Sequence, residues 1–152
     1  IIEDKTSFTS GIGGGNILII GTSNKEVLKA GEAAVKEMKK VDNIILPFPG
    51  GIVRSGSKVG SKYKNLIAST NDAYCPTLKG ITKTKLNKNA ESVLEIVIDG
   101  INEKDISLAM KKGVSIICKK FNKGIQTISA GNYGGKLGPF HFHLRDIMKW
   151  VI

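Results

Sequence analysis

The sequence predicts an α+β fold of the ferredoxin-like, split βαβ kind, in which two helices cover one face of an antiparallel sheet. Apolar runs typical of strands alternate with helix-period segments in the order strand, helix, strand, strand, helix, strand. The 152 residues are enough for one compact domain with a core, and too few for two. We therefore expect a single domain over residues 1–152, with the second face of its sheet left for a partner or another layer.

The first strand and helix are predicted from residues 12–40. Residues 12–20 (IGGGNILII) form a glycine-led run of continuous apolar character, as in a buried strand. Ser23 stands three positions before Glu26, which is a capping box at the start of a helix. Apolar residues then recur at helical spacing, and lysines follow where the negative end of a helix favours them.

The second strand and the segment after it are less regular. Residues 43–48 (NIILPF) predict a short strand that the prolines at 47 and 49 stop. From residue 49 to residue 90 the periodicity is lost, and a structureless loop of this length is uncommon unless it has a function. Its last part, residues 79–89 (KGITKTKLNKN), carries four lysines and no acid, which is typical of a solvated turn or loop.

The remaining elements complete the predicted sheet. Residues 92–100 (SVLEIVIDG) form the third strand, and Asn102 caps a second helix that Gly124 is placed to end. Residues 125–130 (IQTISA) predict the fourth strand. Residues 140–144 (FHFHL) predict a fifth, at the C-terminal edge of the sheet.

The net charge of +10 comes almost wholly from lysine, since Arg54 and Arg145 are the only arginines. Lysine is a point charge that suits acidic small molecules as well as nucleic acid, or serves solubility alone. A basic ferredoxin-like nucleic-acid-binding module remains an alternative, but such modules stack bases on aromatic residues of their central strands. The predicted central strands, NILIIG and LEIVIDG, have none, so we do not expect a nucleic-acid partner.

Metal and membrane signals are weak in this sequence. His141 and His143 alternate on the last predicted strand and so share a face, but no third ligand is evident and we expect no metal. Cys75 and Cys118 form no metal or redox spacing and should be free thiols in a reducing compartment. No apolar run approaches the ~18 residues of a membrane span, so we expect a cytoplasmic protein with no membrane contact.

Three glycine-rich or polar segments at the ends of the predicted elements, and the strand between them, are unusual in combination. They are residues 47–63 (PFPGGIVRSGSKVGSKY), 68–77 (ASTNDAYCPT), 94–103 (LEIVIDGINE) and 128–138 (ISAGNYGGKLG). Together they resemble the C-terminal (distal) lobe of the archaeal-type formylmethanofuran:tetrahydromethanopterin N-formyltransferases, from about Ile2 to Asp146.

The resemblance implies formyl transfer from N-formylmethanofuran to N5 of tetrahydromethanopterin in one-carbon metabolism, with both coenzymes as co-substrates and no bound metal or prosthetic group. It also implies two similar lobes per subunit, with the first lobe absent here, and assembly into dimers or tetramers. Activity would then need a first lobe, which a separate chain could supply. A non-catalytic lobe retained for assembly is the other interpretation.

Glu95 is the predicted catalytic residue. Acyl transfer between amines requires a group that gives and takes a proton. Glu95 shares one face of its strand with Val93 and Val97, and an apolar setting there would raise its pKa and keep it protonated near neutral pH. The resemblance places on Glu95 the glutamate that serves the tetrahedral intermediate. The alternative is an ordinary glutamate on an exposed strand face.

The glycine-rich loops are predicted to bind the acidic coenzymes, because their main-chain N–H groups can approach a ligand closely and their lysines add charge. Ordinary surface loops and turns are the alternative. The predicted substrate-binding residues are Pro49, Gly50, Gly51, Ser57, Lys58, Gly60, Ser61, Ser69, Thr70, Asn71, Tyr74, Asn132, Gly134 and Gly135.

Overall fold

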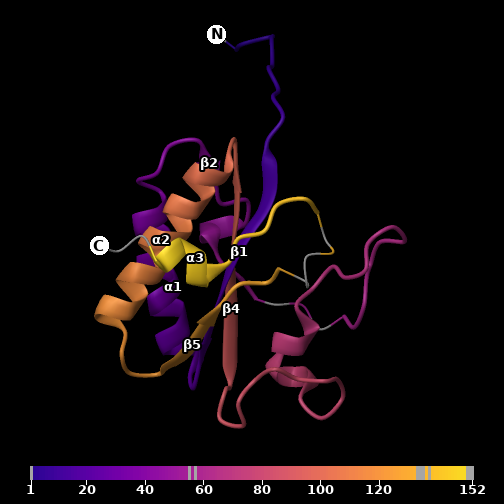
Figure 1. The fold of residues 1–152 in the computed structure, drawn as a ribbon, viewed down its shortest axis with the longest axis vertical. Coiled ribbons are helices and arrows are strands. Elements are labelled where there is room, and N and C mark those ends of the chain that lie inside the picture. Colours follow the sequence, from indigo (N-terminus) through magenta and orange to yellow (C-terminus); the bar gives the residue numbers. More distant parts are fainter. Residues whose placement is uncertain (1, 55, 57, 133–135, 137, 150–152) are drawn as a thin grey trace.

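The structure, a computed structural model, describes residues 2–54, 56, 58–132, 136 and 138–149. It has two layers, with helices α1 and α2 on one face of a five-stranded antiparallel sheet (Figure 1). The elements are β1 (Ile12–Gly21), α1 (Asn24–Met38), β2 (Ile44–Ile45), η1 (Pro49–Gly51), β3 (Val53–Arg54), η2 (Asp72–Tyr74), η3 (Pro76–Leu78), β4 (Ser92–Gly100), α2 (Glu103–Lys120), β5 (Ile125–Ser129) and α3 (Leu144–Lys149).

The sheet order is β2-β4-β1-β5, with β3 also paired to β4. This is the strand order of a split βαβ sandwich. Each of its two βαβ units leaves a gap between its two strands, and one strand of the other unit fills that gap. The predicted α+β, ferredoxin-like class is therefore confirmed. Both predicted helix caps are confirmed as well: Ser23 accepts a hydrogen bond from the Glu26 amide at 3.3 Å, and Asn102 accepts one from the Asp105 amide at 2.9 Å.

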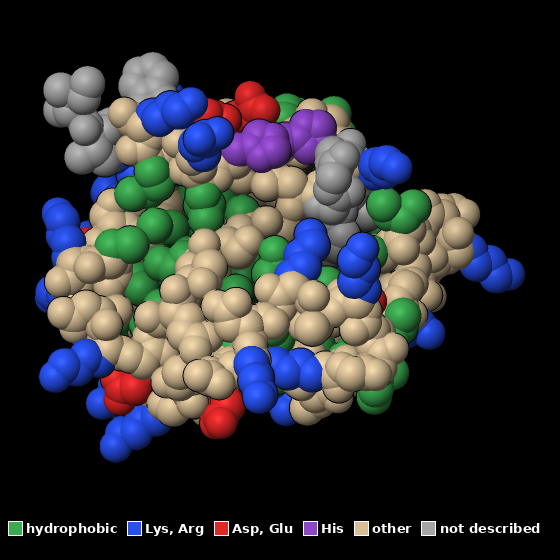
Figure 2. All heavy atoms as spheres, turned by 60° about the horizontal axis from the view of Figure 1, so that its bottom comes forward, with side chains coloured by type: hydrophobic (Ala, Val, Ile, Leu, Met, Phe, Trp, Pro, Cys, Tyr) green, Lys and Arg blue, Asp and Glu red, His purple; other side chains and the backbone are tan. Residues whose placement is uncertain are grey.

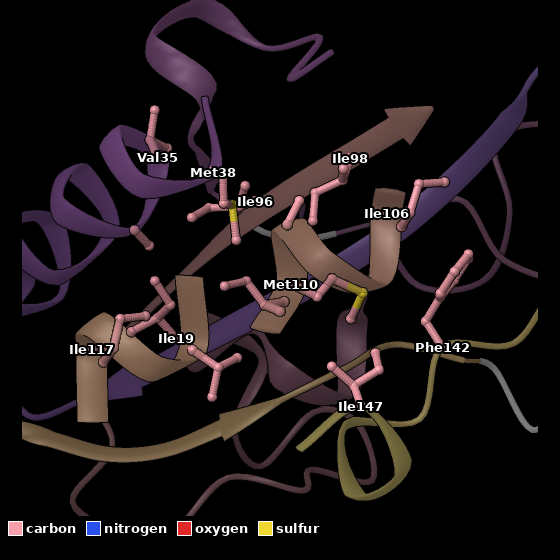
Figure 3. Close-up of a cluster of buried hydrophobic side chains, with 14 of the residues drawn as sticks. Ile19, Val35, Met38, Ile96, Ile98, Ile106, Met110, Ile117, Phe142 and Ile147 are labelled. Carbon is pink, nitrogen blue, oxygen red and sulfur yellow. The ribbon is translucent and has the colours of Figure 1, made fainter. Parts of the chain in front are cut away.

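The main core lies between the helices and the sheet. Alternate residues of β1 and β4, among them Ile19, Ile96 and Ile98, point toward Met38 of α1 and Met110 of α2 (Figure 3). Such period-two alternation is what allows one face of a strand to be packed while the other remains available for a site. The short helix α3 adds to this core through the buried side chain of Ile147.

The predicted strand at 43–48 is shorter in the structure, and a second short strand follows it at Val53–Arg54. Only Ile44–Ile45 pair with β4, opposite Gly100 and Asp99, since the prolines that follow cannot donate to a ladder. The chain then turns through η1 and meets β4 again at Val53–Arg54, opposite Glu95 and Leu94. One edge of β4 is thus covered by two short strands, and the second of them lies beside Glu95.

The described part of the long segment after β3 forms two short 3₁₀ turns and an isolated bridge between Lys79 and Thr82, in keeping with its lost periodicity. Leu86 and Ala90 are buried with Leu18, Ile20 and Val93, which lie on the sheet face away from the helices. The chain itself therefore covers part of this second face. The lysine-rich turn at 79–89 is tied back, because Lys79 Nζ donates to the carbonyls of residues 88 and 90.

The predicted fifth strand at 140–144 is wrong. Residues 140–143 are not in a strand, and α3 begins at Leu144. The Asn132 side chain explains this difference, since it donates to the Phe142 carbonyl at 3.0 Å and accepts from the Phe142 amide at 2.9 Å. Both backbone groups that a sheet ladder would need at Phe142 are therefore already used. Helix α2 also ends earlier than Gly124, at Lys120, and Gly124 takes a positive φ of 80° in the turn into β5.

Candidate active site

Glu95 lies at the centre of β4, on the sheet face away from the helices. Its cross-strand neighbours are Leu18 of β1 and Val53 of β3, and Val93 and Val97 precede and follow it on the same face. The side chain is only 8% exposed. The sequence prediction of a glutamate in an apolar setting is confirmed, and the alternative of an exposed strand glutamate is wrong.

Two asparagine side chains converge on one oxygen of this carboxyl group. Asn16 Nδ2, from β1, donates to Glu95 Oε1 at 2.5 Å, and Asn71 Nδ2, next to η2, donates to the same oxygen at 2.9 Å. Both asparagines are buried. The backbone amide of Gly131 in turn donates to Asn16 Oδ1 at 2.7 Å, so the loop after β5 joins the same network.

Burial raises the pKa of Glu95, because removing a carboxylate from water costs more than removing the neutral acid. The hydrogen bonds from Asn16 and Asn71 act in the opposite direction, since they stabilise the charged form, but burial is the larger effect. The carboxyl group therefore holds its proton to a higher pH than an ordinary glutamate does. A protonated acid on a water-poor face is the state that a proton donor needs.

A cavity of about 460 Å³ opens beside Glu95. Strands β1, β3 and β4 contribute to it, together with the segments around residues 69–71, 131–132 and 138–142. Arg54 and His141 are its other charged or titratable side chains among the described residues. Its lining residues are Gly13, Gly14, Asn16, Phe48, Val53, Arg54, Gly56, Ser69, Thr70, Asn71, Glu95, Val97, Gly131, Asn132, Gly138, Pro139, Phe140, His141 and Phe142.

Four of the predicted substrate-binding residues line this cavity with Glu95. They are Ser69, Thr70, Asn71 and Asn132. Their own bonds show how the loops are held: Ser69 Oγ accepts from the Lys62 amide at 2.8 Å, and Thr70 Oγ1 donates to the Lys58 carbonyl at 2.6 Å. The long irregular segment and the loop after β5 are thus brought to one place.

The other predicted substrate-binding residues that the structure describes do not line the cavity. Pro49, Gly50 and Gly51 form η1, and Gly51 is buried against Val35 of α1. Tyr74 contacts Ser129 through its hydroxyl group, 3.3 Å away, and lines a separate pocket of about 130 Å³. The remaining predicted residues that lie away from the cavity are Lys58, Gly60 and Ser61. Ser57, Gly134 and Gly135 lie outside the described residues.

Asn16 and Gly131 belong to this network but were not among the predicted site residues. Asn16 is the one polar side chain within the buried stretch Asn16–Ile20 of β1, and that interruption was a usable signal, because a buried amide must find a partner. Gly131 carried no comparable signal. A Cβ there would lie 2.8 Å from Asn71 Oδ1 and 2.9 Å from Asn16 Nδ2, so the network requires glycine at this position.

The two histidines do not lie on a strand. They stand in the segment before α3 with ring centroids 6.3 Å apart, and the pair is visible on the surface (Figure 2). In the part of the chain that the structure describes, no three histidine, cysteine, aspartate or glutamate side chains are grouped closely enough to hold a metal ion. No helix within the same residues is both long and apolar enough to cross a membrane.

Fold and site together define a ferredoxin-like lobe that holds a buried carboxylic acid beside an open cavity. Residues 1–147 match the family model described as "FTR, proximal lobe". The chain therefore belongs to the formylmethanofuran–tetrahydromethanopterin formyltransferase family. The matching lobe is the proximal one, whereas the resemblance had indicated the distal lobe.

Individual relatives agree with this family. The chain is 60% identical over 149 residues to the formylmethanofuran–tetrahydromethanopterin formyltransferase of Methylobacillus flagellatus, covering 97% of this chain and 49% of the relative. The formylmethanofuran:tetrahydromethanopterin formyltransferase structure from Methanosarcina barkeri superposes with a TM-score of 0.77 at 45% identity, covering 90% of this chain and 46% of the other.

The formyltransferase/hydrolase complex from Methylorubrum extorquens, solved with methylofuran, also gives a TM-score of 0.77, at 46% identity over 91% of this chain and 45% of the matched chain. The chain therefore spans about half the length of the relatives it matches. The family extends to bacteria, so the expected archaeal-type label describes only part of it.

Proposed function

We propose that this chain is the lobe of a formyltransferase that holds the catalytic acid, and that the enzyme moves a formyl group from N-formylmethanofuran to N5 of tetrahydromethanopterin. The observation that carries the proposal is Glu95, a buried carboxyl group whose burial raises its pKa and which lines a cavity of about 460 Å³. The names of relatives at 45–60% identity support the choice of substrates.

The proposed chemistry is balanced by one proton that Glu95 gives and regains. N5 of the acceptor attacks the formyl carbon, a C–N bond forms and the carbonyl oxygen becomes an oxyanion. Glu95 then protonates the donor nitrogen, so that the old C–N bond breaks and the donor leaves as a free amine. The resulting carboxylate, which accepts hydrogen bonds from Asn16 and Asn71, takes up the proton that N5 releases.

The cavity lining is suited to hold the reacting groups. The Ser69 hydroxyl group, which accepts a hydrogen bond from the Lys62 amide and keeps its own proton to donate, offers a donor for a carbonyl oxygen, and Arg54 supplies a cation for an acidic coenzyme. Orienting two coenzymes can by itself lower the activation barrier by ~7–11 kcal/mol. We assign Ser69, Thr70 and Asn132 to substrate binding, place Asn71 at the Glu95 carboxyl group, and leave the η1 residues and Tyr74 to the fold.

The wider context of the protein is part of the same proposal. We propose that this proximal lobe forms the C-terminal half of its relatives' chain, works with a first lobe, and assembles as a dimer or tetramer in the cytoplasm. Half-length coverage of every relative described above supports the need for a second lobe. The complex from Methylorubrum extorquens is a precedent for assembly with other subunits.

A nucleic-acid-binding role has little support from this geometry. Nucleic-acid binders of this fold use the open sheet face, with aromatic residues on the central strands. Here β1 and β4 contain no aromatic residue, and residues 86–90 cover part of that face. Lysine and arginine side chains are scattered over the molecule rather than gathered into one stripe in the view of Figure 2.

Formyl transfer between the two coenzymes, with and without an added first lobe, tests the proposal. Glu95→Gln should lower the turnover number by about 10²–10⁴-fold, which is the usual contribution of a general acid. Glu91→Gln is the matched control, because the same change is made on an exposed side chain just before β4. Unchanged turnover in Glu95→Gln would remove Glu95 from the reaction, and a wild-type chain inactive with every first lobe would favour the assembly role.

A further inference from the structure

The hydrogen bonds at Glu95 are unevenly distributed between its two oxygens. Asn16 and Asn71 both donate to Oε1. No described residue makes a hydrogen bond to Oε2. This oxygen is nevertheless accessible to solvent, because the fully buried polar atoms without a partner, among the described residues, do not include it. Because Glu95 lines the cavity of about 460 Å³ and both asparagines hold Oε1, Oε2 is the oxygen left to face this cavity.

We propose that Asn16 and Asn71 are positioning residues that hold Glu95 Oε1 as a pure acceptor and thereby fix the acidic proton on Oε2, toward the cavity. The inference rests on the proposed role of Glu95 as the proton donor. It assigns to the two amides the choice of which oxygen carries the proton.

The orientation of the Asn16 amide is set by the backbone. The Gly131 N–H can only donate, so the Asn16 atom that it meets must be the acceptor, Oδ1. The NH₂ end of Asn16 must then point at Glu95. Because both ends of this side chain are held, Asn16 can present only an N–H donor to Oε1. A carboxyl proton on Oε1 that pointed toward Asn16 would face this N–H group and could not form a hydrogen bond with it.

Two donors on Oε1 leave one arrangement for the neutral acid. A carbonyl-type oxygen has two lone pairs, and Asn16 and Asn71 occupy both. A proton on Oε1 would cost one of these bonds in a buried place, so the proton goes to Oε2. When Glu95 gives that proton away, both bonds become charge-assisted and stabilise the carboxylate that forms.

Other charged groups do not account for this arrangement. Arg54 of β3 and His141 before α3 line the same cavity, but both are exposed. Asp99 at the end of β4 accepts a hydrogen bond from the Gly14 amide, and neither it nor Asp72 of η2 lines the cavity. The causes of the raised pKa of Glu95 are its burial, opposed by the two asparagines.

Asn16→Leu and Asn71→Leu test the inference, because each removes one donor with little change of volume. The first measurement is a pH titration of the Glu95 carboxyl carbon by NMR, assigned with Glu95→Gln and made without substrate. Each variant should raise the pKa of Glu95 further, since a bond that stabilises the carboxylate is gone. Asn132→Leu is the matched control: it changes the same residue type in the same cavity without a bond to Glu95, and it should leave the titration unchanged.

The second measurement is formyl transfer as a function of pH. In either leucine variant the turnover number should fall by about 10–100-fold, part of what a general acid contributes, while KM changes little. The alkaline limb of the profile should move to higher pH with the Glu95 titration.

An unchanged Glu95 titration in either variant would overturn the inference, as would a raised KM with an unmoved alkaline limb, which would make the asparagines direct substrate contacts. Either variant alone decides the question if the other does not fold. The titration needs no substrate, so it tests the inference even if the wild-type protein transfers no formyl group. Such a lack of transfer would contradict the proposed function alone.

Discussion

Replacing Glu95 by glutamine should remove a pH-dependent loss of folding stability. Folded Glu95 has a raised pKa, whereas in the unfolded chain it titrates at its ordinary value of about 4.5. Above that value the unfolded state has lost the proton that the folded state still holds. The free energy of unfolding therefore falls as pH rises, by about 1.4 kcal/mol per pH unit, until the pH passes the folded pKa.

Glutamine should fit this place without strain. It has the shape of the neutral acid, its Oε1 can accept from Asn16 and Asn71, and its NH₂ group takes the position of Oε2 toward the cavity. It does not titrate. Glu95→Gln should consequently match the wild type below pH 4.5 and become more stable than the wild type as pH rises, with the difference levelling off above the folded pKa.

Urea denaturation followed by far-ultraviolet circular dichroism, repeated across a pH series, measures this difference. The slope of unfolding free energy against urea should be the same in both proteins, because they expose the same surface. Glu91→Gln serves as the control, and its stability should run parallel to that of the wild type, since that side chain is exposed. A stability difference for Glu95→Gln that stays constant over the series, or a loss that grows with pH, would refute a buried neutral acid.

Three further substitutions test the site and the fold. Gly131→Ala would bring a Cβ to 2.8 Å and 2.9 Å from the two asparagine side chains at Glu95, so formyl transfer should fall by about tenfold or more with an unchanged circular dichroism spectrum. Gly21→Ala would drive a Cβ into the Gly124 carbonyl, and the resulting backbone shift should cost about 1–3 kcal/mol in urea denaturation. Asn102→Ala removes the cap of α2 and should cost about 1 kcal/mol by the same assay, whereas Asn102→Ser should recover most of it.

The fold could be predicted because its local signals agree with one another. Caps at Ser23 and Asn102 start both helices, and continuous apolar runs mark both central strands. Residues 140–144 show where this reasoning stops. Their alternating pattern is real, and Phe142 is buried, but the side chain of a residue ten positions earlier takes the backbone bonds that a strand would need. A tertiary contact of that kind leaves no periodic trace in the sequence.

The site was predictable in part for a related reason. Period two places Glu95 on an apolar face, so its burial follows from β4 alone. The choice of loop residues depended on composition, which cannot distinguish Ser69 in the cavity from Ser61, whose hydroxyl only caps its own turn at Tyr63. Asn16 meets Glu95 through the pairing of β1 with β4 across 79 residues of chain, and that register appears only in the folded structure.

The two faces of β4 carry different residues, and this limits the insertions and deletions that the family can accept in this strand. Leu94, Ile96 and Ile98 anchor the helices, while the acid between them serves the opposite side. Adding or deleting a single residue in β4 before Glu95 would exchange the residues on the two faces of the strand. The carboxyl group would then point into the hydrophobic core and an isoleucine would point into the cavity. Relatives with new substrate preferences should therefore differ by insertions between residues 55 and 90, while the length of this strand stays constant.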